Sequence, residues 1–166
     1  MKKFSLITAL FLCLYSFAGN GDLVKIRGMY YKASADKTEA DDFYTYLQSS
    51  PGIGGPLLSG YIGMSYMIKA NYSWNPYNKL SYFVKGKNYL DEAIEKDPGN
   101  LELRFLRFCV QTNAPGFLGY SDKISSDKAM LLAGYGNLRD EDLRARIKEF
   151  MRGSKHCSPR EKQAFK

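Results

Sequence analysis

The clearest pattern in the chain is a pair of apolar repeats with helical spacing, carried by residues 57–68 and 80–94. In both, apolar residues recur every three or four positions, which predicts a helix buried on most sides for the first run and a helix with one polar face for the second. Asn75 and Pro76 separate the two runs. Asparagine is a favourable N-cap, and a proline at the first helical position loses only an amide that has no partner there. We therefore predict two long helices, the second ended by the turn at 97–100.

Shorter runs with the same period predict further helices on either side of this pair. Connections are short, so sequential helices are expected to be antiparallel neighbours. Apolar residues surround most of the helix predicted over 101–110, which favours a central position for it. The last helix starts close to the chain end and is expected to be short and frayed. Residues suited to capping precede the runs: Asp22, Asp36, Asn100, Asp140 and Ser158. The sequence thus predicts an all-α array of antiparallel helical hairpins with seven or eight helices.

Two groups of residues in the central pair have a recognisable spacing. The first is Ile62-Gly63 followed by Tyr66. The second follows in the next helix and its exit: Gly86, Leu90, Ala93 and Pro98. Over about residues 56–98 they resemble the two helices of a tetratricopeptide repeat, with an insertion between the groups that lengthens both helices. The resemblance implies a hairpin array with a concave groove for a peptide or glycan.

The N-terminus has the features of a secretory signal peptide. Lys2 and Lys3 precede an apolar run over residues 4–17, and Ser16 and Ala18 supply small residues at positions −3 and −1. The run is too short to span a bilayer comfortably, and no second one follows. We predict that residues 1–18 are cleaved, that residues 19–166 form a single all-α domain without a transmembrane span, and that the protein is exported to the periplasm or beyond.

The chain is basic, with a formal net charge of +7, and the excess concentrates at the C-terminus. We call residues 144–166 the basic C-terminal segment. Its basic residues far outnumber its acids: Arg144, Arg146, Lys148, Arg152, Lys155, Arg160, Lys162 and Lys166, against Glu149 and Glu161. The segment is either a solvated face and tail or a contact for an anionic membrane, glycan or acidic partner. For that contact the candidates are Arg160, Lys162 and Lys166. We expect no nucleic acid as a partner of an exported protein.

Little in the sequence suits catalysis or cofactor binding. The only histidine, His156, is next to Cys157, and adjacent residues rarely orient as a nucleophile and its base. A metal site would need further ligands. We therefore expect neither enzymatic activity nor a cofactor. Cys109 and Cys157 remain after cleavage, and in an oxidising compartment they form either a disulfide or two separate thiols.

Aromatic residues are the best candidates for a binding surface. Tyrosine and tryptophan offer a large rigid face with a polar group, which is useful both in a core and at an interface. The central pair also contains Tyr66 and Tyr89, and the candidates for a binding surface in it are Tyr61, Tyr72, Trp74, Tyr77 and Tyr82. The apolar loop 113–120 either packs on the core or faces a ligand. Arg104 and Arg107, one turn apart, either pair with acids of a neighbouring helix or bind an anion.

These features favour an exported, non-catalytic helical scaffold that mediates protein–protein or peptide interaction in the cell envelope. The alternative is a binder of an anionic membrane or glycan surface through the basic C-terminal segment.

Overall fold

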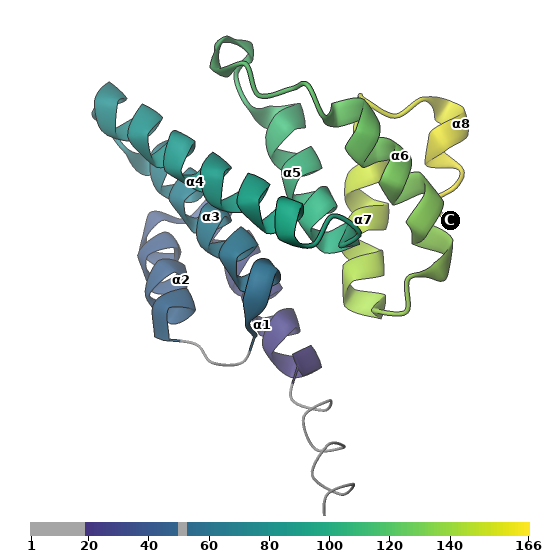
Figure 1. Cartoon of the computed structure of the whole chain (residues 1–166), viewed down its shortest axis with the longest axis horizontal. Coiled ribbons are helices and arrows are strands. Elements are labelled where there is room, and N and C mark those ends of the chain that lie inside the picture. The colour runs from purple at the N-terminus through teal and green to yellow at the C-terminus, as the bar shows by residue number, and fades with distance from the viewer. Residues whose placement is uncertain (1–18, 50–52) are drawn as a thin grey trace, which may run out of the picture.

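The computed structural model describes residues 19–49 and 53–166, and within these ranges the chain is all-α, with no strand (Figure 1). The predicted fold class is therefore confirmed. Residues 1–18, which carry the signal-peptide prediction, lie outside the described ranges. The helices are α1 (Gly19–Ala35), α2 (Lys37–Ser49), α3 (Gly55–Tyr72), α4 (Pro76–Lys96), α5 (Leu101–Asn113), η1 (Gly116–Leu118), α6 (Ile124–Gly134), η2 (Tyr135–Asn137), α7 (Glu141–Gly153) and α8 (Pro159–Lys162).

Helices α3 and α4 form the long central hairpin and share the most extensive contact in the described chain. Their backbones meet at two glycines. A Cβ atom added to Gly63 would lie 2.7 Å from the carbonyl oxygen of Gly86, and one added to Gly86 would lie 2.5 Å from that of Gly63. The turn of the hairpin, residues 73–75, projects at the upper end of the molecule in Figure 1. We call this end the hairpin tip.

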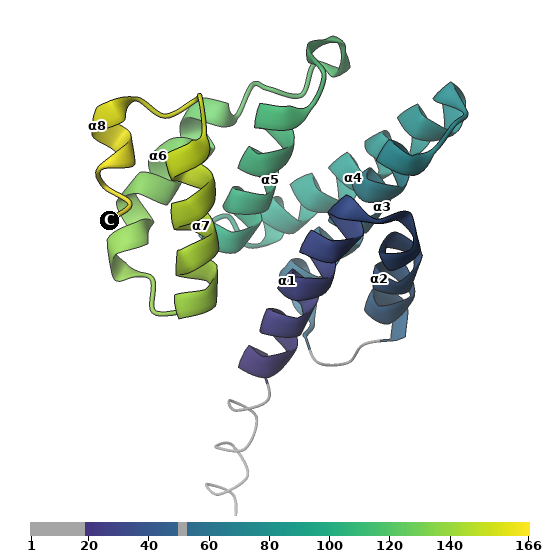
Figure 2. The ribbon, with the colours of Figure 1, turned by 180° about the vertical axis from the view of Figure 1, so that it is seen from behind.

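Helix α5 lies between two hydrophobic clusters, which explains why apolar residues surround it. Leu103 and Leu106 belong to the cluster built mainly from α1 to α4. Phe105 and Phe108 belong to the cluster built from α6, α7 and the chain end. Figure 2 shows α1 and α2 on one side of the molecule and α6 to α8 on the other, with α5 between them. The central position predicted for this helix is confirmed.

Capping side chains begin most helices where the sequence predicts. The side chain of Asn75 accepts a hydrogen bond from the amide of Tyr77, at 2.9 Å. Equivalent caps are made by Asn100 for α5, Asp140 for α7 and Ser158 for α8. The prediction for Asp22 is wrong: α1 begins at Gly19 and Asp22 lies in its first turn. An acid is favourable there too, because the N-terminal end of the helix dipole is positive.

The last helix, α8, is short as predicted, but the chain end packs on the fold and is not frayed. Lys128 of α6 forms an ion pair with Glu161 of α8, at 2.8 Å. Beyond α8, the ring of Phe165 is fully buried against Tyr135 of η2, with ring centroids 4.8 Å apart. The chain end is therefore anchored on α6 and η2. None of the described helices is long and apolar enough to cross a membrane.

Candidate functional site

An open cleft of about 660 Å³ lies between the hairpin tip and α5. Helices α1, α3, α4, α5 and α7 contribute to it, together with the loop that follows α5. We call it the α4–α5 cleft. Its floor is formed by large apolar side chains: Tyr30, Met64, Met67, Phe83, Val110 and Phe150. Its entrance carries Leu80 on one wall and Phe117 on the other, both exposed.

The cleft exists because α4 and α5 separate with distance from the turn that joins them. The turn spans only residues 97–100, so the two helices are close at that end and apart at the hairpin tip (Figure 1). The side chains that face the gap follow the helical period. On α4 these are Pro76, Leu80 and Phe83, and on α5 they are Val110 and Asn113. A run that reads as core in the sequence thus lines the cleft, with Pro76 and Leu80 exposed and Phe83 buried.

The loop 113–120 combines both roles that its composition suggests. Tyr120 is buried, packs edge-on against Phe83 at a centroid distance of 5.9 Å, and donates a hydrogen bond to Asp91 at 2.8 Å. Phe117, in contrast, is 87% exposed and lines the cleft. The loop is therefore fixed to the core by its end and presents its apolar tip to the cleft.

The aromatic residues singled out from the sequence fall into three environments. Trp74 and Tyr77 are exposed, at 96% and 85%, on the hairpin tip beside the cleft. Tyr72 and Tyr82 are half-buried against the central core. Tyr61 lies inside that core and donates a hydrogen bond to Glu102 at 2.5 Å, so it cannot contact a ligand. The period of α3 already places Tyr61 on the buried side.

Few polar groups line the cleft. Besides two tyrosines and Cys109 they are Ser34, Asn71, Lys79 and Asn113, and no carboxylate is among the lining residues that the structure describes. Asn71 and Asn113 lie on opposite walls, at the ends of α3 and α5. Lys79 is the one charged lining group and is exposed. The cleft therefore offers mainly apolar contact, with two amides and one cation near its mouth.

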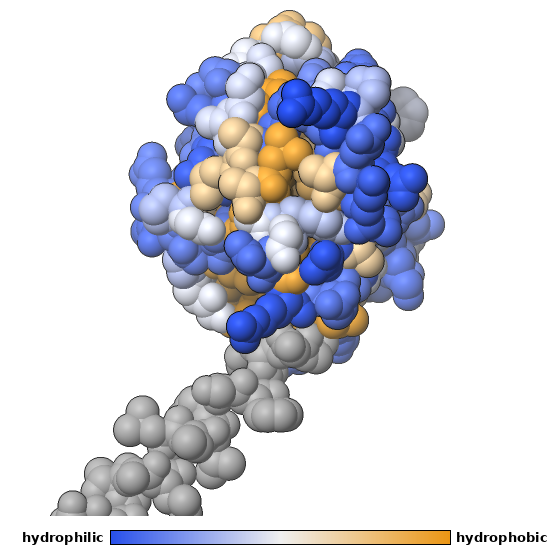
Figure 3. Space-filling model, turned by 90° about the vertical axis from the view of Figure 1, so that its right-hand side faces the viewer, coloured by the Kyte–Doolittle hydropathy of each residue, from blue (hydrophilic) through white to orange (hydrophobic). Residues whose placement is uncertain are grey.

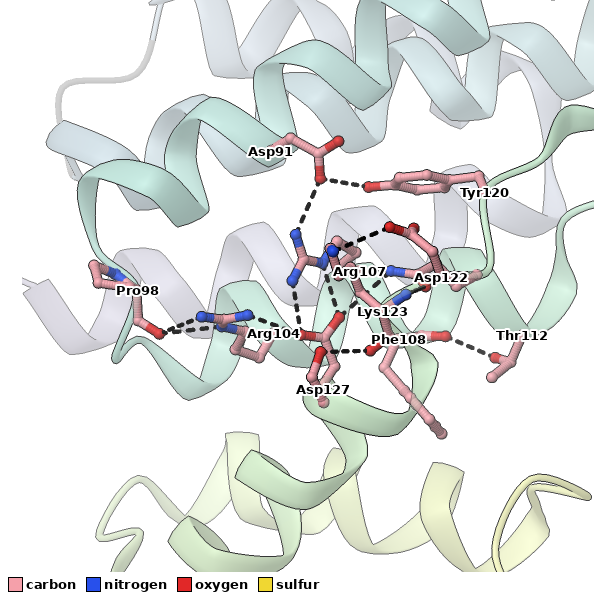
Figure 4. Close-up of polar contacts among 12 residues, drawn as sticks. Asp91, Pro98, Arg104, Arg107, Phe108, Thr112, Tyr120, Asp122, Lys123 and Asp127 are labelled. Atoms are coloured by element: carbon pink, nitrogen blue, oxygen red, sulfur yellow. Dashed lines mark hydrogen bonds and ion pairs between the residues drawn. The ribbon is translucent and has the colours of Figure 1, made fainter.

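Arg104 and Arg107 are paired with acids of neighbouring helices (Figure 4). Arg107 is buried and donates two hydrogen bonds of 2.8 Å to Asp127 of α6 and one of 3.2 Å to Asp91 of α4. Arg104 donates to Asp127 at 3.1 Å and to the carbonyl oxygen of Pro98. Burial opposes the charge of Arg107, but its bonds to Asp127 and Asp91 outweigh this and raise its pKa. Both guanidinium groups are thus occupied within the protein, and neither is available to bind an external anion.

A second buried arginine, Arg27 of α1, did not stand out in the sequence. Its guanidinium donates two hydrogen bonds of 2.7 Å to Glu102 of α5. It also reaches Asp140 at 2.8 Å and Asp142 at 3.0 Å, where α7 begins. One side chain therefore joins α1, α5 and α7. No pattern of spacing marks this role, because these partners are far from Arg27 in the chain.

The two cysteines that the structure describes are not joined by the disulfide considered from the sequence: Cys109 and Cys157 are both free. Cys109 lines the cleft and Cys157 is buried in the second cluster, and burial raises the pKa of each thiol. The single histidine, His156, accepts a hydrogen bond from Lys128 through its backbone carbonyl at 2.9 Å. In the part of the chain that the structure describes, no three His, Cys, Asp or Glu residues form a group that could hold a metal ion.

The basic C-terminal residues are only partly available at the surface. Arg160 and Lys166 are exposed, and Lys162 is half-buried. Arg146 is paired with Asp142 at 3.0 Å and lies over the ring of Tyr31. Figure 3 shows the side of the molecule on which α6 and α8 lie: a small apolar group is surrounded by hydrophilic side chains.

The cleft has the composition of a binding surface, and the residues that form it were predicted only in part. Phe117 was included in the ambiguous loop 113–120. Met64, Met67, Phe83 and Val110 have the period of core residues, and no sequence signal separates a core from an open cleft. Comparisons of the chain with protein-family models, curated proteins and solved structures find no match.

Proposed function

We propose that this protein is an exported, non-catalytic helical scaffold of the cell envelope that binds a segment of a protein or peptide partner in the α4–α5 cleft. The observation that supports this is the cleft itself, an apolar hollow of about 660 Å³ with exposed apolar residues at its entrance. Ligand sites are typically concave and mostly apolar, with a few polar groups that orient the ligand. Protein interfaces are enriched in aromatic residues and methionine.

The lining suits a peptide that presents two or three apolar side chains. Met64 and Met67 are flexible and polarisable, so the floor can adapt to side chains of different shape. Asn71 and Asn113 carry amides that both donate and accept hydrogen bonds, which matches the needs of a peptide backbone. Full burial of an apolar side chain contributes about 1.5–3 kcal/mol, so Leu80 and Phe117 would gain from being covered.

Two exposed residues of α4, one turn apart, allow a matched test. Leu80 lines the cleft and Val84 does not, although both are apolar and about half-exposed. Peptides selected from a displayed random library on the wild-type protein should be rich in apolar residues. Their affinity should fall at least about tenfold for Leu80→Glu, because a carboxylate at the entrance is desolvated without a partner. Val84→Glu should bind as the wild type does.

Isothermal titration calorimetry on the selected peptides measures both variants. Binding that is equal in Leu80→Glu and the wild type would place the peptide elsewhere and reject the cleft as the site. A library that yields no peptide would reject peptide binding by this chain.

The alternative, contact with an anionic surface through Arg160, Lys162 and Lys166, stays a prediction. It is supported by the exposure of Arg160 and Lys166. The triple variant with glutamine at these positions tests it, in the vesicle experiment described below.

A further inference from the structure

Three large aromatic side chains are more exposed than any other large hydrophobic residue in the described chain: Trp74 at 96%, Phe117 at 87% and Tyr77 at 85%. They come from two segments that are distant in the sequence, the α3–α4 turn with the start of α4, and the loop after α5. Both segments project at the same end of the molecule in Figures 1 and 2. Pro76 and Phe117 also line opposite walls of one cleft. We call these three residues the aromatic end.

From this arrangement we propose that the aromatic end docks on a bilayer that contains anionic lipid. Single exposed hydrophobic residues are normal, but a group of protruding aromatics marks an interaction site. Tryptophan and tyrosine favour the boundary between membrane and water, where the ring contacts apolar chains and the N–H or O–H stays hydrated. The inference does not depend on peptide binding in the cleft.

The charge distribution identifies the membrane as the partner. Neither residues 70–90 nor residues 103–121 contain an aspartate or a glutamate. Lys79 is exposed within the first of these segments, two residues after Tyr77 and five after Trp74. Basic side chains near a membrane surface are attracted to anionic headgroups, and these two segments add no carboxylate that would repel them. Asp41 of α2 and Asp122, which lie close to these segments, are each paired with a lysine, Lys69 at 3.7 Å and Lys123 at 3.1 Å. The aromatic end is therefore complementary to an anionic lipid surface.

Other tyrosines of the hairpin make contacts within the fold. Tyr82 and Tyr89 lie farther down the hairpin and both stack on Tyr66, with centroid distances of 6.3 and 5.8 Å. Lys85 lies over the ring of Tyr66. Those tyrosines are thus used within the fold, whereas Trp74 and Tyr77 extend beyond it. In the docked state the cleft would open toward the bilayer surface.

The protein carries its own reporter, because Trp74 is the only tryptophan in the sequence. The experiment uses the chain from residue 19, as expected after cleavage, so that the apolar leader does not bind lipid itself. Its fluorescence is recorded with vesicles of phosphatidylcholine alone and of phosphatidylcholine mixed equally with phosphatidylglycerol. We expect the emission to shift to shorter wavelength and the protein to co-sediment with the mixed vesicles. Binding should weaken in high salt, because exposed charges are screened.

Variants then locate the contact. Tyr77→Ser and Phe117→Ser keep the reporter, and each should reduce partitioning into mixed vesicles about tenfold, the effect of losing most of the burial of one aromatic ring. Trp74→Ser, measured by co-sedimentation, should have a similar effect. Val24→Ser is the matched control: Val24 is 46% exposed on α1, whose first turns lie at the opposite end of the molecule. Its binding should be unchanged, and circular dichroism checks that each variant folds.

Several results would overturn the proposal. One is an unchanged Trp74 emission when the protein sediments with vesicles, which would show that another surface makes the contact. Another is full binding by Phe117→Ser and Tyr77→Ser together with loss of binding by the glutamine variant of Arg160, Lys162 and Lys166. That outcome would assign the contact to the basic C-terminus. No sedimentation with mixed vesicles at low salt would exclude membrane docking altogether. Peptide binding is measured without lipid, so either proposal can fail alone.

Discussion

Replacing Gly86 by alanine should weaken the central hairpin, although alanine normally favours a helix. An added Cβ atom would lie 2.5 Å from the carbonyl oxygen of Gly63 and 2.7 Å from Cγ of Met67. The methionine side chain can move aside. The carbonyl oxygen belongs to the backbone of α3, so α3 and α4 must separate along their whole contact to make room for the methyl group.

The size of the effect follows from two opposing terms. Alanine is more favourable than glycine in a helix interior by about 1 kcal/mol. Overpacking a close contact costs about 1–3 kcal/mol, and an obstacle that cannot rotate away favours the upper end of that range. We therefore expect a net loss of about 1–2 kcal/mol in the free energy of unfolding. For a chain of about this length each kcal/mol lowers the melting temperature by about 2–4 °C.

Gly28 provides the control, because it lies inside α1 and a Cβ atom added to it meets nothing within 4 Å. Gly28→Ala should be neutral or stabilising by up to about 1 kcal/mol. Urea unfolding followed by far-ultraviolet circular dichroism measures both variants against the wild type. If Gly86→Ala is as stable as Gly28→Ala, the backbones of α3 and α4 do not touch as described, and the reasoning fails.

Three further substitutions test other parts of the fold in the same unfolding assay. Ala93 is fully buried on α4, so Ala93→Leu should cost about 1–3 kcal/mol, and an unchanged melting temperature would contradict its position. Burial opposes ionisation of Asp140, but the hydrogen bond from Arg27 outweighs this and lowers its pKa below 3.8. This pair therefore stabilises the fold above that pH and loses its contribution as the pH falls below it. In Arg27→Met the free energy of unfolding should therefore fall less on acidification than in the wild type. If it depends on pH as in the wild type, the link between Arg27 and Asp140 is refuted. Phe165→Ala should lower the free energy of unfolding by about 3–5 kcal/mol, because the ring is fully buried. A change near zero would support the frayed chain end that the sequence predicts.

The helices and most of their starts were predictable because they depend on local chemistry. Asn75, Asn100, Asp140 and Ser158 cap helices through amides two or three residues away. The apolar period likewise involves neighbours within one or two turns. The start of the first helix was placed wrongly at Asp22, because α1 begins at Gly19 and Asp22 lies in its first turn.

The candidate site was less predictable because it depends on distant residues. Arg27 is separated from Glu102 by 75 positions and from Asp140 by 113. No local spacing shows that these groups meet. The cleft has the same difficulty, since Met67, Phe83 and Val110 bear the period of core residues whether or not another helix covers them. Met67 and Phe83 are buried in the core, and the cleft reaches them because of the angle between α4 and α5, which is a property of the assembled fold.

The two arginine networks explain why that angle opens toward the hairpin tip. The ion pairs of α5 among the described residues are all made from its first two turns: Glu102 with Arg27, and Arg104 and Arg107 with Asp127. Arg107 also forms an ion pair with Asp91 of α4, toward the end of the hairpin opposite its tip, which we call its base. Removing one partner of a buried ion pair leaves an uncompensated charge, which costs about 3–5 kcal/mol, so these contacts strongly favour one arrangement at the base.

The upper half of α5 has no such tie to α4 among the described residues, and there the two helices face each other with apolar and amide side chains instead. Closing the cleft would require α5 to pivot about its base, which would stretch the directional bonds of Arg107 to Asp91 and Asp127. The polar contacts at the base of the cleft therefore oppose its closure. We infer that the buried charges serve the cleft by fixing its walls apart, so that a partner finds the apolar surface already formed.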